Sequence, residues 1–329
     1  MKQYILFALL ALLFTACSTK EVYEPKVVSS DWEKEESISH EIVDTAENVA
    51  LLENRHVLTR DGEIDIRIPE NQRVISLSDG KIISASIDGN VTVTDLESGS
   101  ASSYDLKKTI AAASMKDNIL ALVFANNDIA LYDTDAKSLI FKEQNGKAIA
   151  NDRRIVNPFF FNDLVMFPTL DGKIVIVKAD AQKRLRTSIV SSETYFNNVI
   201  FFQLAHNKIL GATSYKLLAL SQKELRQKYE IRNILVDGDR IYITTKQGEV
   251  MALTPDLQLE SKIKFPFAHF LGMIAANNKL YILEKEGYLI VVDKENFDYS
   301  VHEVNVDEDA FVFVGNDGFY VEDKKILVQ

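Results

Sequence analysis

Cysteine is almost absent from this sequence, because Cys17 is the only one among 329 residues. A single cysteine cannot form an internal disulfide or a cysteine-based zinc site. Positive charge is also in deficit, since 37 Lys and Arg residues are outnumbered by 48 Asp and Glu residues and the net charge is −11. Binding to a nucleic-acid backbone depends on clustered positive charge, so we expect no nucleic-acid partner.

The usual arrangements of catalytic and metal-binding residues are missing as well. None of the five histidines lies four residues from another, and the chain has no Gly-x-Ser-x-Gly elbow and no Walker loop. The acidic run at 305–310 lacks the regular oxygen-ligand spacing of a calcium loop. We therefore predict no enzyme activity, no metal and no cofactor.

Long hydrophobic runs are absent except at the N-terminus. Lys2 precedes an apolar run at 5–14, and two small residues then lead to Cys17. The run is too short for a spanning helix, which needs ~20 apolar residues, but it has the pattern of a secretory signal. The small residues before the cysteine resemble the bacterial lipobox, which implies a signal peptide at 1–16 and a lipid on Cys17. The alternative is an ordinary signal peptide with an incidental cysteine.

Residues 17–50 form a polar, acidic segment with few residues suited to a core. Such a composition favours a flexible chain, so we predict a lipidated acidic tether at 17–50 and a folded domain at 51–329. Trp32 lies in this segment and is interpreted as an isolated exposed aromatic. Ser18 stands where enterobacterial lipoproteins of the inner membrane carry aspartate; by that resemblance the protein is expected on the periplasmic face of the outer membrane.

The folded domain contains a repeated pattern of short apolar runs separated by Gly, Asn or Asp turns. In "LVDGDRIYITTKQGEVMALTPD" (235–256) each of two glycine turns opens an alternating run, and similar segments lie at 74–99, 115–137, 161–183, 205–224, 276–296 and 314–329. The second turn recurs after 33 to 45 residues. Period-two alternation with a repeat near forty residues is typical of propeller blades and excludes helix pairs. We predict an all-β fold, a β-propeller of four-stranded antiparallel blades.

The number of blades follows from how the copies are counted. Seven copies predict seven blades if residues 51–62 are only a lead-in; eight are expected if that segment and the stretch 138–160 contain a degenerate blade. The last copy has only three strand-like runs, so an N-terminal strand is needed to close the ring and to remove its open edges. We predict that "EIDIRI" (63–68) supplies this strand.

Two adjacent copies carry a family resemblance. "VDGDRIYITTKQGEVMALT" (236–254) and "NNKLYILEKEGYLIVVD" (277–293) resemble adjacent blades of the BamB family of outer-membrane assembly lipoproteins, and more generally the quinoprotein-type (PQQ-like) repeat. The sequences match closely over roughly sixty residues, and elsewhere only the pattern of apolar runs and turns agrees. The tryptophan that ends the family's repeat is absent from every copy. The resemblance implies a scaffold without catalytic activity, present as one copy in a hetero-complex.

In that family, a propeller edge binds the periplasmic domains of the central barrel-insertion protein, BamA, through an arginine loop and a neighbouring acidic loop. The resemblance places the arginine loop at 149–158, with Arg153 as the best match and Arg154 beside it. Its neighbour at 192–201 has Asn197 and Asn198 where acidic residues are expected, and Glu193 as the nearest carboxylate. These five residues are the predicted partner-binding residues, although the asparagines depart from the family pattern.

Two other functions fit the same repeat. The first is a degenerate quinoprotein dehydrogenase. By the resemblance, the active enzymes of that family are longer chains that have an aromatic floor under the cofactor and a calcium-bound aspartate. The second is a propeller lipoprotein that binds another envelope ligand, such as a glycan. Because the only tryptophan and the only cysteine lie outside the repeats, the residues that hold a quinone cofactor are missing, and we favour the scaffold.

Overall fold

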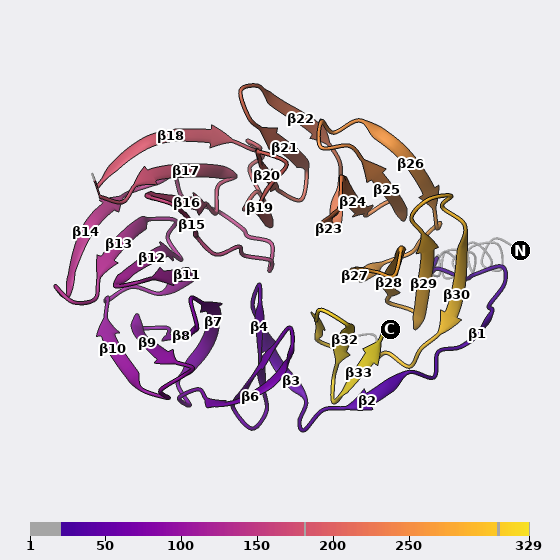
Figure 1. Ribbon diagram of the computed structural model, residues 1–329, viewed down its shortest axis with the longest axis horizontal. Helices are drawn as coiled ribbons and strands as arrows, with labels where there is room; N and C mark the ends of the chain where they lie inside the picture. Colours follow the sequence, from indigo (N-terminus) through magenta and orange to yellow (C-terminus); the bar gives the residue numbers. More distant parts are fainter. Residues whose placement is uncertain (1–20, 181, 308–309, 329) are drawn as a thin grey trace, which may run out of the picture.

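The repeated segments fold into eight antiparallel sheets that are arranged as the blades of a ring (Figure 1). The structure is a computed structural model that describes residues 21–180, 182–307 and 310–328. We number the blades 1 to 8 in chain order. In each blade the first strand lies nearest the centre of the ring and the last lies at its outer edge.

Each blade runs from its innermost strand outward in the following order. Blades 1 and 2 contain β3 (Ile42–Thr45), β4 (Val49–Leu52), β5 (His56–Thr59) and β6 (Gly62–Arg67), then β7 (Gln72–Ser78), β8 (Lys81–Ser86), β9 (Asn90–Asp95) and β10 (Ala101–Asp105). Blades 3 and 4 contain β11 (Ile110–Lys116), β12 (Ile119–Phe124), β13 (Ile129–Asp133) and β14 (Ser138–Glu143), then β15 (Phe159–Phe161), β16 (Leu164–Pro168), β17 (Lys173–Lys178) and β18 (Lys183–Ile189).

The second half of the ring repeats the same order. Blades 5 and 6 contain β19 (Phe201–Ala205), β20 (Lys208–Ala212), β21 (Lys216–Leu220) and β22 (Glu224–Lys228), then β23 (Ile231–Asp237), β24 (Arg240–Thr245), β25 (Glu249–Leu253) and β26 (Leu259–Lys264). Blades 7 and 8 contain β27 (Phe270–Ala276), β28 (Lys279–Glu284), β29 (Tyr288–Asp293), β30 (Tyr299–Glu303) and β1 (Ser30–Asp31), then β31 (Val312–Val314), β32 (Gly318–Val321), β33 (Lys324–Leu327) and β2 (Glu35–Ser37).

Sequence composition follows the position of a strand in its blade. The two middle strands are largely buried, as in the wholly apolar β12, and pack against the neighbouring blades, whereas the outer strand β22 is exposed along its whole length. The core is therefore a series of apolar layers between adjacent blades, such as the layer in which Ile83 of blade 2 meets Leu122 of blade 3.

Gly248 shows why glycine is needed at the turn between the second and third strands. Its backbone has a φ of 75°, in the left-handed region, and a Cβ atom there would lie 2.0 Å from the carbonyl oxygen of Phe265. The amide of Phe265 donates a hydrogen bond of 2.7 Å to the carbonyl of Gly248. Only glycine combines this conformation with so close an approach of two backbones.

The ring has eight blades, so the higher of the two predicted counts is the right one. The eighth is blade 1, which residues 42–67 form from β3 to β6. Its strands were difficult to recognise because β3 and the start of β4 lie inside the acidic segment that we interpreted as a tether. The stretch 138–160 contains no extra blade; it supplies β14, a long loop and the start of β15.

An N-terminal strand closes the ring, as predicted, but it is not the predicted segment. β2 pairs antiparallel with β33 and completes blade 8, with Glu35 opposite Ile326. Residues 63–67 instead belong to β6, the outer strand of blade 1, which pairs with β5. An alternating polar and apolar run suits any outer strand, and the pattern alone does not determine which blade it joins.

The acidic segment is folded onto the ring over most of its length, which corrects the predicted boundary at residue 51. Residues 23–38, which we call the N-terminal strap, run along the outside of blades 7 and 8 in indigo (Figure 1). Trp32 is partly buried rather than isolated: its Nε1 donates to the carbonyl of Leu327 at 2.7 Å, and its ring packs edge-on against Tyr281 and His302. The strap is thus part of the closure.

We expect Trp32→Ala to destabilise the propeller by about 2 kcal/mol, because it removes a hydrogen bond and half-buried aromatic packing between blades 7 and 8. Thermal unfolding and limited proteolysis measure the effect, with new cleavage expected between residues 23 and 38. Trp32→Phe keeps most of the packing and should lose less stability. Equal stability of Trp32→Ala and the wild-type protein would show that the strap does not contribute to closure.

The predictions for the signal peptide at 1–16 and for lipidation at Cys17 lie outside the described residues. Within the described part of the chain, no helix is long and apolar enough to cross a membrane. Both predictions therefore remain predictions.

Candidate functional site

The two loops that sequence comparison singled out lie on the same face of the ring. The β14–β15 loop (144–158) and the β18–β19 loop (190–200) each connect the outer strand of one blade to the inner strand of the next. Apart from β1, which pairs in parallel with β30, the strands of every blade are antiparallel, so all such connections emerge on one face, which we call the connection face. The two loops are joined directly, since the amide of Phe196 donates to the carbonyl of Ala150 at 2.8 Å.

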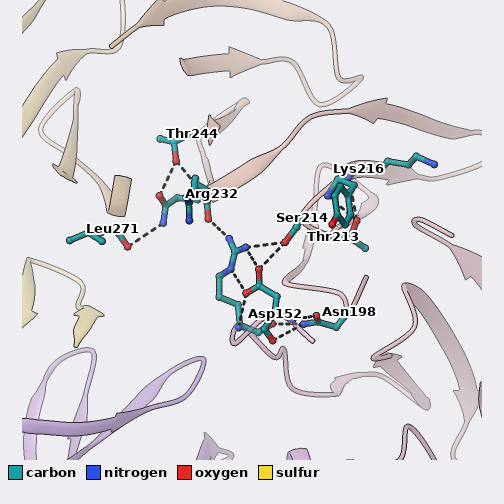
Figure 2. Close-up of polar contacts among 11 residues, drawn as sticks. Asp152, Asn198, Thr213, Ser214, Lys216, Arg232, Thr244 and Leu271 are labelled. Atoms are coloured by element: carbon teal, nitrogen blue, oxygen red, sulfur yellow. Dashed lines mark hydrogen bonds and ion pairs between the residues drawn. The ribbon is translucent and has the colours of Figure 1, made fainter. Parts of the chain in front are cut away.

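Asn198 holds the base of the longer loop in place. Its side chain is fully buried; Oδ1 accepts a 2.6 Å hydrogen bond from the amide of Asp152, and Nδ2 donates to the carbonyl of Arg154 at 2.8 Å. Figure 2 shows this clamp beside Asp152. An amide side chain both donates and accepts hydrogen bonds, so Asn198 can pair with a backbone amide and a backbone carbonyl at once. An ionised acidic residue only accepts and could not do this. Its role in the structure is therefore internal.

Arg154 points into the ring and not toward a partner. Its Nε donates to Asp152 Oδ1 at 2.8 Å, its Nη2 donates to Ser214 Oγ at 3.1 Å, and its Nη1 donates to the carbonyl of Arg232 (Figure 2). Ser214 Oγ donates in turn to Asp152 Oδ2 at 2.8 Å. The loop of blades 3 and 4 is thereby tied to blades 5 and 6, so substitution of Arg154 would disturb the ring before it altered a contact surface.

The charges of this network are unevenly matched. Burial alone would raise the pKa of Asp152, but the hydrogen bonds and charge of Arg154, together with the Ser214 hydroxyl, outweigh it and lower the pKa to about 2. Burial and the nearby charge of Arg154 lower the pKa of Arg232, and its Nε is buried without a hydrogen-bond partner in the described structure. A single carboxylate therefore faces a pair of neighbouring guanidinium groups and offsets only one of their two positive charges.

The far end of the same loop is fixed to blade 1. The backbone amide and the Nδ2 of Asn157 both donate to Glu47 Oε2, at 2.7 and 2.8 Å, and the Oδ1 of Asn157 accepts from the amide of Ala113 in blade 3. Desolvation by the surrounding protein raises the pKa of Glu47, while the bonds from Asn157 oppose this. Residues 152–157 thus connect blades on different sides of the ring, and the loop is a rigid part of the scaffold.

Asn197 is also directed inward. It is buried, and its Nδ2 donates to the carbonyls of Asp171 and Ser191 at 3.0 and 3.1 Å, which fixes the turn next to Gly172. The structure therefore gives Arg154, Asn197 and Asn198 contacts within the ring. Their assignment to partner binding is not supported by their positions, and it stays a prediction only for the exposed residues of the two loops.

Arg153 and Glu193 are exposed, and the same two loops carry exposed apolar residues. Tyr195 is 55% exposed, Phe196 48% and Ile149 67%, and the bond from Phe196 to Ala150 brings the tips together. We call these five residues the docking patch: Ile149, Arg153, Glu193, Tyr195 and Phe196. Exposed aromatic residues next to an arginine are typical of the energetic centres of protein interfaces.

Phe196 lies in the left-handed region, with a φ of 52°. A bulky residue in that region costs about 1 kcal/mol or more, and such outliers cluster at functional sites. The aromatic ring is thus held outward by an unfavourable backbone conformation. The apolar run at 195–202 is divided between two environments, because Tyr195 and Phe196 are exposed whereas Val199, Ile200 and Phe202 are buried. Period-two alternation of apolar residues does not predict a loop tip whose aromatic side chains face solvent.

The described residues do not offer an alternative chemical site. Among residues 21–180, 182–307 and 310–328, no group of three His, Cys, Asp or Glu side chains is arranged to hold a metal ion. The docking patch consists of exposed loop side chains on a fixed backbone, and its aromatic rings offer contact area to a partner. Its geometry suits binding of another macromolecule.

Comparisons with known proteins point in the same direction. No protein-family model matches the chain. The chain is 32% identical to the plasminogen-binding protein PgbB of Helicobacter pylori strain J99 over 195 residues, which is 58% of this chain and 36% of that protein. It is 29% identical to the outer membrane protein assembly factor BamB of Salmonella typhimurium over 153 residues, 44% of this chain and 36% of that protein. The chain thus matches about a third of the length of these relatives.

Solved structures share the fold over almost the whole chain. BamB from Moraxella catarrhalis superposes with a TM-score of 0.69 and 11% identity, covering 89% of this chain and 97% of that one. The C-terminal WD40 domain of Sif2 gives a TM-score of 0.64 at 11% identity, covering 88% and 97%. At such low identity these structures support the fold alone. Sequence and fold together make this chain a BamB-like β-propeller of eight blades.

Proposed function

We propose that the protein is a non-catalytic scaffold of the outer-membrane β-barrel assembly machinery, anchored by a lipid on Cys17 at the periplasmic face of the outer membrane. Its resemblance to BamB in sequence and fold supports this role, and so do the names of its relatives, which describe binding and assembly proteins. The rigid ring presents the docking patch to the periplasmic domains of a BamA-like barrel-insertion protein. One copy acts within a hetero-complex.

The observation that carries this proposal is the division of the two loops into an internal half and an exposed half. Arg154 and Asn198 fix the loops to the ring, and the docking patch displays Arg153, Tyr195 and Phe196 on that fixed base. A rigid base lowers the entropic cost of binding, because the contact residues are already in position.

We expect Arg153→Glu to reduce co-purification of the lipidated protein with the barrel-assembly complex about tenfold, because it reverses the charge of an exposed residue of the docking patch. Arg153 is exposed, so the variant should fold normally. Arg67→Glu makes the same charge change on the outer strand of blade 1 and is the matched control. Pull-down from detergent-solubilised envelopes measures the effect; equal recovery of both variants would refute the patch.

A second candidate function follows from the other relative. The 32% identity to a plasminogen-binding protein favours an extracellular binding role for this propeller, with plasminogen as the specific ligand to test. Surface plasmon resonance with immobilised protein distinguishes the two functions. Binding to plasminogen together with no recovery of the barrel-assembly complex would favour the second function and exclude the first.

A further inference from the structure

The N-terminal strap becomes fixed to the ring only a few residues after the predicted lipidation site. Tyr23 is 5% exposed and lies in the apolar layer between blades 6 and 7. Its ring packs edge-on against Phe265 and Tyr288, with centroid distances of 6.0 and 5.6 Å. Burial raises the pKa of the Tyr23 hydroxyl, as expected for a side chain held in an apolar layer.

After Tyr23 the strap follows the outer edge of blade 7. The amides of Ser29 and Trp32 donate to the carbonyls of Val301 and Glu303, both at 2.8 Å, and β1 pairs in parallel with β30. The strap is therefore attached to one specific blade by both side-chain packing and backbone hydrogen bonds. It cannot act as a long swivel between a lipid and the ring.

Chain length then limits how far blade 7 can lie from the lipid. Five residues lie between Cys17 and Tyr23, and the six Cα-to-Cα steps that join them span about 20 Å when the chain is fully extended. We propose that the outer edge of blade 7 lies against the lipid surface, so that the ring stands on its rim at the membrane. This inference rests on the lipid anchor at Cys17 in the proposed function.

The edge of blade 7 has the side chains that such a position requires. Val22, Val27 and Val28, in and just before the strap, are exposed to solvent, as is Tyr299 on β30, and the Tyr299 ring lies 5.0 Å from Phe265, beside Tyr23. Small apolar residues and tyrosine suit the boundary between headgroups and water. Acidic residues of the strap outnumber its lysines, so the edge fits a zwitterionic surface and not a strongly anionic one.

This orientation leaves the docking patch free. In Figure 1 the strap and β30 lie at the right end of the long axis of the ring, and β14 lies at the left end. The docking patch belongs to the connections after β14 and β18, which lie in blades 3 to 5 and not in blade 7, so the patch does not share the membrane-facing edge. A periplasmic domain can therefore reach the connection face from the side, without competing with lipid.

Two labelled variants test the orientation. Lys26→Cys places a fluorophore on the strap, and Ser102→Cys places it on β10, across the ring; both positions are exposed, and lipidation of Cys17 leaves the new thiol as the only free one. Lipidated protein is reconstituted in phosphatidylcholine vesicles that carry a nitroxide on the headgroup. We expect quenching at position 26 to exceed quenching at position 102 at least threefold.

A third variant tests the limit set by chain length. Insertion of twenty Gly and Ser residues between Thr19 and Lys20 keeps the lipid and the ring but lengthens the connection, and the difference between the two labels should fall by more than half. Equal quenching of both labels in the vesicle-bound protein with its natural spacing would overturn the orientation while leaving the anchor intact. Failure to incorporate palmitate and to float with vesicles would instead overturn the anchor, and the orientation with it.

Discussion

Asp152→Asn is expected to lower the free energy of unfolding by about 2 kcal/mol at neutral pH. A carboxyl group whose pKa falls from 3.8 to about 2 on folding contributes about this much to stability. Its side chain is only 19% exposed, so solvent does not screen the interaction strongly. The substitution also leaves Arg154 and Arg232 as neighbouring cations with no carboxylate between them, and their repulsion adds to the loss.

The stability difference between the wild-type protein and Asp152→Asn should depend on pH. Because the pKa of Asp152 is lower in the folded state, its contribution is fully present above about pH 4 and is lost as the pH falls toward 2. The wild-type protein and Asp152→Asn should therefore differ most at neutral pH and converge between pH 4 and pH 2. A difference that stayed constant over this range would contradict an ionic origin.

Thermal unfolding at several pH values measures the effect, and a loss of about 2 kcal/mol corresponds to a fall in Tm of roughly 4 °C or more for a domain of this size. Asp135→Asn is the matched control, since Asp135 is exposed in the turn between β13 and β14. The control should unfold like the wild-type protein at every pH. Wild-type stability of Asp152→Asn at neutral pH would show that the Arg154 network does not hold the loop.

The repeat itself could be predicted from the sequence because it depends on local properties. Apolar alternation and Gly or Asn turns specify hairpins wherever they occur, so the all-β propeller fold was predictable, and so was the existence of a closing strand. Which segment closes the ring depends on contacts between residues about 290 positions apart, such as Glu35 with Ile326. No local pattern contains that information.

The candidate site was predictable at the level of loops and not of side chains. Arg153 and Arg154 are adjacent and chemically identical, yet one is exposed and the other is tied to Asp152 and Ser214. Their roles diverge because Asn198 fixes the backbone of this loop, through a contact between residues 44 positions apart. The resemblance named two loops that prove to lie side by side, whereas the direction of each side chain depends on the folded ring.

Phe196→Asn should weaken docking at least thirtyfold without any loss of stability. Phe196 lies where the two loops of the docking patch are joined, and its side chain is exposed; removal of an aromatic side chain that acts as a hot spot costs about 2 kcal/mol or more in binding. Asparagine tolerates the left-handed backbone, with its φ of 52°, better than phenylalanine does. Relief of that strain should leave the Tm unchanged or raise it by roughly 1 to 2 °C, as expected for up to about 1 kcal/mol.

The opposite directions of the two effects separate a binding role from a structural one. Phe267 provides the matched control: it lies on the connection face between β26 and β27, it is 58% exposed, and its φ of 65° is equally unfavourable. Phe267→Asn should gain stability in the same way but leave docking intact, because Phe267 lies outside the patch. Thermal unfolding and pull-down of the barrel-assembly complex measure both properties on the same preparations. If both variants lost docking equally, binding would depend on the whole connection face; if neither did, the strained backbone at Phe196 would have no role in recognition.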